Sequence, residues 1–238
     1  MAGHSKWANI KYRKDRADRK KGKFFSRAIK EIISAVKQGG PDTKANSKLR
    51  IAIEKAKEGN VPHDTIERNI KKASDPGTED FLPFQYELYG FGGVGILASG
   101  LTDNRNRTAS EIQIVINKCG GVLAKPGSVA FNFNRQGVID VEKESIAEDV
   151  LFLLVSSLGA EEMEIKEDCY HILTSVETFA AVKEAIEKEG GKIVEAELAM
   201  VPKVWVESTE EEAAANVLLI ERLEGLDDVD ALYHNMAL

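Results

Sequence analysis

Several features that would define a class of protein are scarce or missing in this sequence. Its 238 residues contain only two cysteines and four histidines, and none of the six has a neighbour at metal-site spacing. We therefore expect Cys119 and Cys169 to be small, buried apolar residues in a reducing compartment. No apolar run reaches the roughly 18 residues of a membrane span, and no apolar signal core follows Met1. These absences predict a cytoplasmic protein with no metal ion or other cofactor.

The usual motifs of catalysis are also missing. The run Gly90–Gly95 formally matches G-x-G-x-x-G, but a nucleotide site needs a helix after it, and Val94–Ala98 continues as a strand-like apolar run. A β-hairpin is therefore predicted there. Asp227, Asp228 and Asp230 lack the glycine and the distal glutamate of a calcium loop, and we interpret them as a solvated turn. Because no nucleophile is placed beside a base, the sequence predicts a non-enzymatic protein with no catalytic residues.

Charge is distributed very unevenly along the chain. Residues 1–75 contain 20 Lys and Arg against 9 Asp and Glu, a net charge of +11, whereas the remaining residues contain 12 against 30, a net charge of −18. This split is typical of a nucleic-acid-binding segment joined to acidic domains that have another role. The alternative is a solvated helical face that happens to be basic and binds no nucleic acid.

The basic residues are concentrated in the first 23 positions. This segment has no apolar stripe that would fix it against another surface, so we expect a mobile arm. No recognition helix with Arg, Asn or Gln placed for base edges stands out, so the basic residues suit phosphate contacts. The aromatic residues of the arm are available for stacking on bases. The predicted nucleic-acid-binding residues of the arm and of the helix after it are Lys6, Trp7, Lys11, Tyr12, Arg13, Lys14, Arg16, Arg19, Lys20, Lys21, Lys23, Arg27 and Lys30.

Three helices are predicted next from apolar periodicity and end signals. The second spans about Thr43 to Glu58, and the third begins at Asp64 with Glu67 as a capping box. The first runs from about Lys23 to Gln38 and carries apolar residues on one side and a row of positive charge on the other: Lys23, Arg27, Lys30 and Lys37.

Beyond residue 77 the pattern changes to that of strands. Two strand candidates, 84–89 and 94–101, precede a helix capped by Thr108 and Glu111, and two short strands flank Lys125–Gly127. From residue 137 to residue 200, the predicted order strand, helix, strand, strand, helix, strand is that of a ferredoxin-like split unit.

The last predicted elements have too little apolar surface to form a domain of their own. They are a strand near Val204–Val206, a helix capped by Thr209 and Glu212, and a strand around Val229–His234. We expect them to complete the sheet that begins at Phe84. The predicted fold is therefore α+β with three domains: residues 1–76 as a basic arm and helical domain, residues 80–134 and 203–238 as a discontinuous α+β domain, and residues 135–202 as an inserted ferredoxin-like domain.

The loop before the helix at Thr108 is a second candidate site. Arg105 and Arg107 precede a helix N-terminus, where free backbone N–H groups favour an anion. A phosphate or a carboxylate of a partner would fit a site made by Asn104, Arg105, Arg107 and Thr108. In the alternative, the arginines pair with acidic groups of their own domain.

The sequence resembles the YebC family, also called the PmpR or probable transcriptional regulatory protein family. The resemblance covers nearly the whole length. It rests on the stretches MAGHSKWANIKYRKDRADRKKGKFFSRAIKEI, GGPDTKANSKLRIAIEKAKEGNVPHDTIERNIKK, YGFGGVGILASGLTDNRNRTASEI, NKCGGVLAKPGSVAFNF and LEGLDDVDALYHN. It implies a helical N-terminal domain and two α+β domains, with the third inserted in the second.

The resemblance leaves two classes of function open. Bacterial members are described as transcriptional regulators that bind DNA, whereas mitochondrial relatives activate translation of cytochrome c oxidase subunit I. Some bacterial relatives are linked to the ribosome and to difficult stretches such as consecutive prolines. The expected partners are therefore DNA or ribosomal RNA, with ribosomal proteins, tRNA or RNA polymerase as candidates for the acidic domains. We expect a monomer that does not bind membranes.

Overall fold

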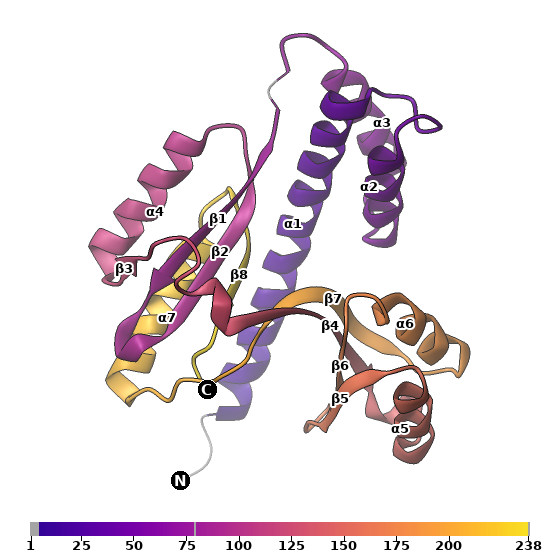
Figure 1. The fold of residues 1–238 in the computed structure, drawn as a ribbon, viewed down its shortest axis with the longest axis vertical. Helices are drawn as coiled ribbons and strands as arrows, with labels where there is room; N and C mark the ends of the chain where they lie inside the picture. Colours follow the sequence, from indigo (N-terminus) through magenta and orange to yellow (C-terminus); the bar gives the residue numbers. More distant parts are fainter. Residues whose placement is uncertain (1–4, 79, 238) are drawn as a thin grey trace.

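The computed structural model describes the backbone of residues 5–78 and 80–237 and the side chains of residues 22–78 and 80–237. Within these ranges the chain forms a helical unit followed by two antiparallel four-stranded sheets with helices packed on them (Figure 1). The fold is α+β, as predicted.

The helical unit consists of α1 (Ser5–Gly39), α2 (Ser47–Glu58) and α3 (His63–Ala73). Its core joins Ile32 and Val36 of α1 to Leu49 of α2 and Ile66 of α3, all nearly inaccessible to solvent. These residues follow the helical spacing that the sequence predicted.

The helix starts differ from the prediction in three places. The first helix begins at Ser5 and not at Lys23. Residues 5–21 contain no proline or glycine and are rich in Lys, Arg and Ala, which favour helix once the docked second half of α1 supplies the nucleus. The second begins at Ser47, because Asn46 caps it by accepting a hydrogen bond from Leu49 N at 3.0 Å. The third begins at His63 without a side-chain cap, so the predicted capping box is wrong.

The predicted mobility of the arm, residues 1–23, stays a prediction. The side chains of this segment up to residue 21 lie outside the described ones.

The middle sheet is built from β1 (Leu82–Tyr89), β2 (Gly95–Thr102), β3 (Val122–Leu123) and β8 (Val229–His234), in the order β3-β1-β2-β8. Strands β1 and β2 pair antiparallel over their whole length around the short 3₁₀ turn Phe91–Gly93, which confirms the predicted hairpin.

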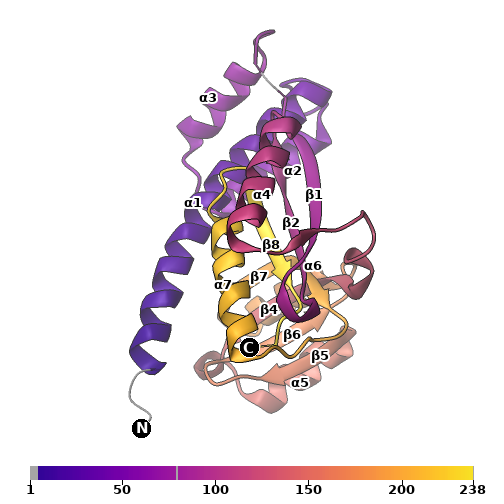
Figure 2. The same cartoon turned by 90° about the vertical axis from the view of Figure 1, so that its left-hand side faces the viewer.

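One face of this sheet is covered by α4 (Arg105–Cys119) and α7 (Glu210–Glu224), which lie side by side on it (Figure 2). Thr209 and Glu212 form the predicted capping box of α7. In contrast, α4 is capped by Asn104 and not by Thr108. The predicted start of α4 is therefore one turn too late. Both asparagine and threonine are good N-cap residues, so the sequence pattern alone does not decide between Asn104 and Thr108.

The inserted unit contains β4 (Phe133–Glu142), α5 (Glu148–Ser157), β5 (Ala160–Ile165), β6 (Cys169–Thr174), α6 (Phe179–Lys188) and β7 (Ile193–Pro202). Its strands are all antiparallel in the order β5-β6-β4-β7. This is the strand order of the predicted ferredoxin-like unit.

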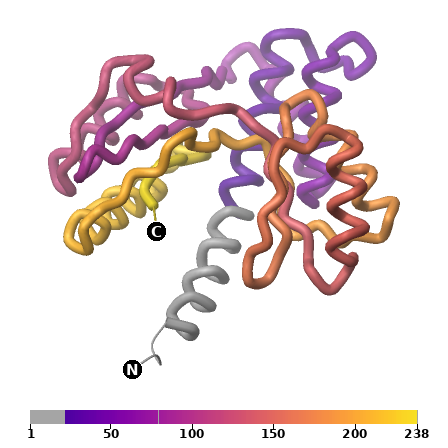
Figure 3. The backbone as a smooth tube through the Cα atoms, turned by 60° about the horizontal axis from the view of Figure 1, so that its bottom comes forward, coloured from indigo at the N-terminus to yellow at the C-terminus, as the bar shows by residue number. Residues whose placement is uncertain are grey.

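The two units are connected by a pair of segments that run side by side (Figure 3). The β4–β7 ladder begins at Phe133 and Pro202, and just before it Lys203 N donates to Asn132 O at 2.8 Å. Two short strands predicted here are wrong: a 3₁₀ turn follows Lys125–Gly127, and Val204–Val206 forms only one bridge, from Val206 to Met236. Strand β8 returns to pair with β2, so the C-terminus completes the sheet begun at β1. The exact domain boundaries stay a prediction.

A buried carboxylate fixes the first of these connecting segments. Glu87 of β1 is only 7% exposed and accepts hydrogen bonds from the backbone N–H groups of Gly127, Val129 and Ala130 at 2.6, 2.7 and 2.8 Å. Burial alone would raise the pKa of Glu87, but the three backbone donors outweigh it and the pKa lies below its ordinary value.

Replacing Glu87 with Gln should therefore loosen this segment. The neutral amide has one acceptor oxygen where three N–H groups converge, so we expect a loss of about 2–4 kcal/mol in the free energy of unfolding at pH 7. The lowered pKa means that the wild-type contribution is present above about pH 4.3 and is lost as the pH falls through the folded pKa. Glu162→Gln, on the exposed edge strand β5, is the control. Equal unfolding midpoints in urea for the two variants would contradict the assigned role of Glu87.

Candidate nucleic-acid interface

Helix α1 carries the whole predicted basic surface, but its two halves differ in what can be described. The predicted contacts from Lys6 to Lys21, including Trp7 and Tyr12, lie outside the described side chains. Lys23, Arg27 and Lys30 lie in the second half, which packs against the other two helices and the middle sheet. Their contacts can be stated atom by atom.

Two lysines of α1 bind backbone carbonyls of the middle domain. Lys23 Nζ donates to Val229 O at 2.6 Å, and Lys30 Nζ donates to Leu101 O at 2.9 Å and Asp227 O at 3.1 Å. Burial lowers the pKa of Lys23, and nearby acids offset part of this effect. These two residues therefore clamp α1 to the edge strand β8, to the turn before it and to the end of β2, whereas the sequence predicted them on the side opposite the packed one.

Arg27 and Lys37 also have partners within the chain. Arg27 Nε lies 2.9 Å from Glu31 Oε1, and Lys37 Nζ donates to Asp75 O at 2.8 Å. Burial works against the charge of Arg27, but Glu31 raises its pKa. The predicted row of four thus divides, because Lys23 and Lys30 form part of an internal contact while Arg27 and Lys37 stay near the surface. Nucleic-acid contacts by Lys23, Arg27 and Lys30 stay a prediction.

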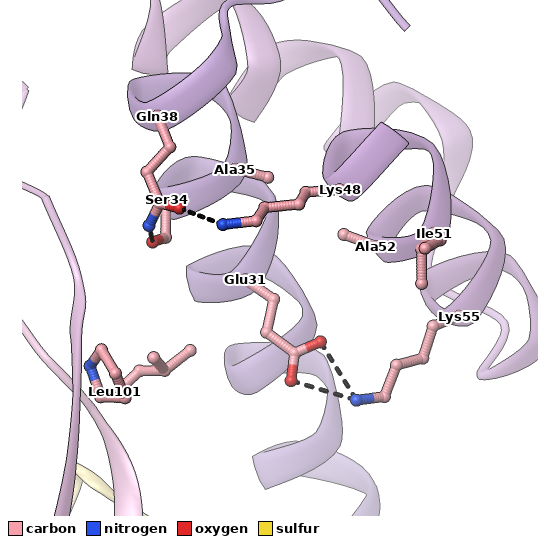
Figure 4. A pocket seen from close by; sticks show the side chains of 10 residues that line it. Glu31, Ser34, Ala35, Gln38, Lys48, Ile51, Ala52, Lys55 and Leu101 are labelled. Carbon is pink, nitrogen blue, oxygen red and sulfur yellow. Dashed lines mark hydrogen bonds and ion pairs between the residues drawn. The ribbon is translucent and has the colours of Figure 1, made fainter. Parts of the chain in front are cut away.

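A cleft of about 360 Å³ lies between α1, α2 and the ends of β1 and β2 (Figure 4). Its lining is mainly apolar, with Ile51 and Leu101 on opposite sides. Glu31 accepts two hydrogen bonds from Lys55 at 3.0 and 3.1 Å, and Lys48 donates to Gln38 at 2.9 Å. Both lysines that line the cleft are therefore engaged by neighbouring side chains.

Next to the lysine clamp, one buried carboxylate collects donors from several elements. Asp228 is 4% exposed, and its Oδ2 accepts hydrogen bonds from Thr102 at 3.0 Å, Thr108 at 2.7 Å and Arg107 at 2.8 Å. Lys30 Nζ lies 3.6 Å from its Oδ1. Burial alone would raise the pKa of Asp228, but Arg107, the two threonines and Lys30 bring it below its ordinary value.

A second acid beside it behaves differently. Asp230 has a side chain that is 3% exposed, and it accepts a hydrogen bond from Leu101 N at 3.0 Å. Lys30 is 3.8 Å away, and burial raises the pKa of Asp230 despite this charge. The interpretation of Asp227, Asp228 and Asp230 as a solvated turn is therefore wrong for the last two, and only Asp227 is exposed.

The structure also places the four residues of the predicted loop site. Asn104 caps α4 and accepts from the backbone N–H groups of residues 106 and 107. Arg107 bonds Asp103 at 2.6 Å and Asp228 at 2.8 Å, and both carboxylates raise its pKa. Arg105 donates to Pro83 O at 3.2 Å. Arg107 thus pairs with acids of its own domain, which was the alternative; a partner contact at this loop stays a prediction.

Sequence reasoning missed the two buried acids that organise this region, Glu87 and Asp228. Each lies next to apolar residues of a strand, which is a weak signal of burial, but their partners are far away in the sequence. Among the described residues, no group of His, Cys, Asp and Glu could hold a metal ion. Cys119 and Cys169 are half-buried free thiols, less buried than expected.

Comparison with known proteins now identifies the family. Residues 5–76 match the model of the TACO1/YebC protein N-terminal domain, and residues 81–236 match that of the TACO1/YebC second and third domain. The chain belongs to the TACO1/YebC family. The predicted resemblance is confirmed.

Relatives in this family are similar over their whole length. A probable transcriptional regulatory protein of Protochlamydia amoebophila is 52% identical over 236 residues, which is 99% of this chain and 96% of the relative. One from Chlamydia trachomatis is 52% identical over 238 residues and covers both chains completely. A crystal structure of a conserved hypothetical protein from Aquifex aeolicus is 40% identical, with a TM-score of 0.75 over 91% of this chain and 90% of that one.

The two relatives from Protochlamydia amoebophila and Chlamydia trachomatis are both named probable transcriptional regulatory proteins. In the described part of the chain, the helices are all too short or too polar to cross a membrane.

The clamp between α1 and the middle sheet leads to a stability prediction. In Asp228→Asn an amide NH₂ group replaces one acceptor oxygen and faces the donors of Thr102, Thr108 or Arg107. Because donors then oppose donors in a buried site, we expect the free energy of unfolding to fall by about 3 kcal/mol. Asp227→Asn changes an exposed side chain by the same atoms and should stay within about 0.5 kcal/mol of wild type. Chemical unfolding followed by circular dichroism measures both. If the two variants unfold at the same denaturant concentration, Asp228 is not the centre of the clamp.

Proposed function

We propose that this protein is a non-enzymatic regulator of gene expression that binds DNA through its N-terminal basic segment. The observation that carries the proposal is the segregation of charge. Residues 1–23 contain nine Lys and Arg against two Asp, in a chain whose residues beyond 75 have a net charge of −18. Such a segment attracts a polyanion while the rest of the molecule repels it, so binding is oriented as well as favourable.

The contacts of α1 narrow the set of binding residues. Lys23 and Lys30 hold the middle sheet through short hydrogen bonds to carbonyl groups. Using them for phosphates would break the clamp, so the principal phosphate contacts are assigned to the basic residues between Lys6 and Lys21. Trp7 and Tyr12 lie in the same stretch and are assigned to stacking.

A second candidate function is supported by the residue types. Lysine is the commonest basic residue of the segment, and it contacts phosphates without distinguishing bases. A factor that grips structured RNA, such as a ribosome-associated translation factor, needs little more than that. The family's translational members make ribosomal RNA the alternative target, with cytoplasmic action in either case.

The salt dependence of binding tests the phosphate contacts. With about six phosphates engaged, log K against log salt should have a slope of about −5 on duplex DNA and about −4 on single strands. Lys20→Ala with Lys21→Ala should reduce the magnitude of the DNA slope by about 2. The control, Lys166→Ala with Lys188→Ala, makes the same change of charge at exposed positions of the inserted unit. A slope near zero for wild type, or equal slopes for the two double variants, contradicts the proposal.

Competition separates DNA from RNA. We expect duplex DNA to displace a bound fluorescent duplex at least as well as a fully base-paired RNA of the same length does, with equal losses in the Lys20/Lys21 variant across several DNA sequences. Displacement by RNA at concentrations tenfold lower would favour the translation factor. A loss confined to one DNA sequence would instead indicate base readout.

A further inference from the structure

The two connecting segments between the middle sheet and the inserted unit form a small surface of their own. We call residues 124–132 and 203–206 the neck. Lys203 joins the two segments, because its backbone N–H donates to Asn132 O at 2.8 Å and its Nζ donates to Phe131 O at 2.7 Å. Residues near 131 and near 204 therefore lie next to one another although they are more than 70 positions apart in the sequence.

The neck exposes large aromatic side chains. Phe131 is 62% exposed and Trp205 is 57% exposed, and Val204 between the lysine and the tryptophan is 64% exposed. Among the described side chains, only one other aromatic residue, Phe152, is exposed to this degree. Phe133, two residues after Phe131, is buried in the cluster with Val129. Phe133 of β4 is thus buried next to the neck, whereas the two aromatic residues of the neck itself stay in solvent, which is typical of a contact surface.

These aromatic residues sit on a rigid support. The segment before Phe131 is held by the three hydrogen bonds to Glu87 and by Tyr89 Oη, which donates to Ser128 O at 2.6 Å. On the other side of the neck, Val206 N donates to Asn235 O at 2.7 Å. Binding of a partner to the neck would therefore cost little conformational entropy, because the neck is already ordered.

The two segments of the neck contain Lys125 and Lys203 and no acidic residue. No Asp or Glu occurs between Glu111 and Asp140 or between Glu197 and Glu207. The same stretches contain the basic residues Lys118, Lys125, Arg135 and Lys203, all of them exposed. In a region of the chain with a net charge of −18, an acid-free stretch with exposed cations and aromatic rings matches an anion that carries flat rings.

We propose that the neck is a second nucleic-acid contact, in which Phe131 and Trp205 stack on unpaired bases and Lys125 lies close to a phosphate. Bases within a duplex have their faces covered, so this contact requires a single strand, a loop or an end. The inference rests on the proposed function, since it assigns a further contact to the same nucleic acid. It also makes unpaired nucleotides part of the preferred target.

Tryptophan fluorescence gives a direct test. The chain has two tryptophans, so Trp7→Phe leaves Trp205 as the only one. Titration of this variant with an unstructured 20-nucleotide RNA should quench Trp205, with a midpoint equal to that of the anisotropy change of the labelled RNA. Inorganic polyphosphate, which has the charge without the bases, should leave Trp205 unquenched. Equal quenching by polyphosphate would overturn the stacking contact.

Affinity measurements give a second readout. Phe131→Leu and Trp205→Leu should each weaken binding of the RNA by roughly tenfold, and their thermal unfolding midpoints show whether each variant is folded. Phe152→Leu is the matched control, because it changes the third aromatic residue that is exposed among the described side chains. Phe152 lies on α5 of the acidic inserted unit, so its replacement should leave the affinity unchanged.

The outcomes distinguish this inference from the proposed function. Binding with a steep salt slope, no quenching of Trp205 and no effect of the two leucine variants would overturn the neck contact and leave the basic segment as the binding site. If RNA leaves the fluorescence of Trp205 unchanged and only a bound protein quenches it, the neck is a protein contact, and the inference is overturned as well. Absence of binding to both duplex DNA and RNA would overturn the proposed function itself.

Discussion

The position of the helical unit on the middle sheet depends on one buried ionic contact, that of Lys30 and Arg107 with Asp228. The carboxylate of Asp228 lies where α1, the end of β2, the start of α4 and the start of β8 meet. It accepts hydrogen bonds from β2 and α4 and forms an ion pair with Lys30 of α1. A buried charge is tolerated only when its partners are complete. The contact therefore fixes the position of the helical unit on the sheet far more narrowly than apolar packing alone would do.

This contact also changes how the basic helix is to be understood. The sequence predicts a basic run from Lys6 to Lys30 that contacts nucleic acid throughout, first as a mobile arm and then as a row on a packed helix. In the structure, Lys23 and Lys30 cover carbonyl groups at β8 and its preceding turn, and a charged side chain along an edge strand is a common protection against unwanted strand pairing. The run is therefore divided between a structural part and a part assigned to nucleic acid.

The sequence predicted those features that depend on local pattern. The apolar spacing of Ile32 and Val36, the hairpin after Tyr89, the strand and helix order from residue 137 and the capping box at Thr209 all follow from neighbouring residues. The start of α1 was missed because the segment has no apolar periodicity, and helix propensity alone is a weak guide. The burial of Glu87 and Asp228 was missed because their partners lie about 40 and more than 100 positions away. No local pattern distinguishes a buried acid from a solvated one when both precede or occupy a strand.

The return of the chain to the first sheet has a consequence for synthesis. Strand β8 and Asp228 belong to the last 11 residues of the chain, whereas the lysines that they bind lie near its beginning. Because translation proceeds from the N-terminus, α1 and the inserted unit have their complete sequences long before β8 exists. For most of its synthesis the nascent chain must therefore carry Lys23 without its carbonyl partner on β8, and a sheet with β2 at its open edge. The final domain arrangement is set only when the last strand emerges.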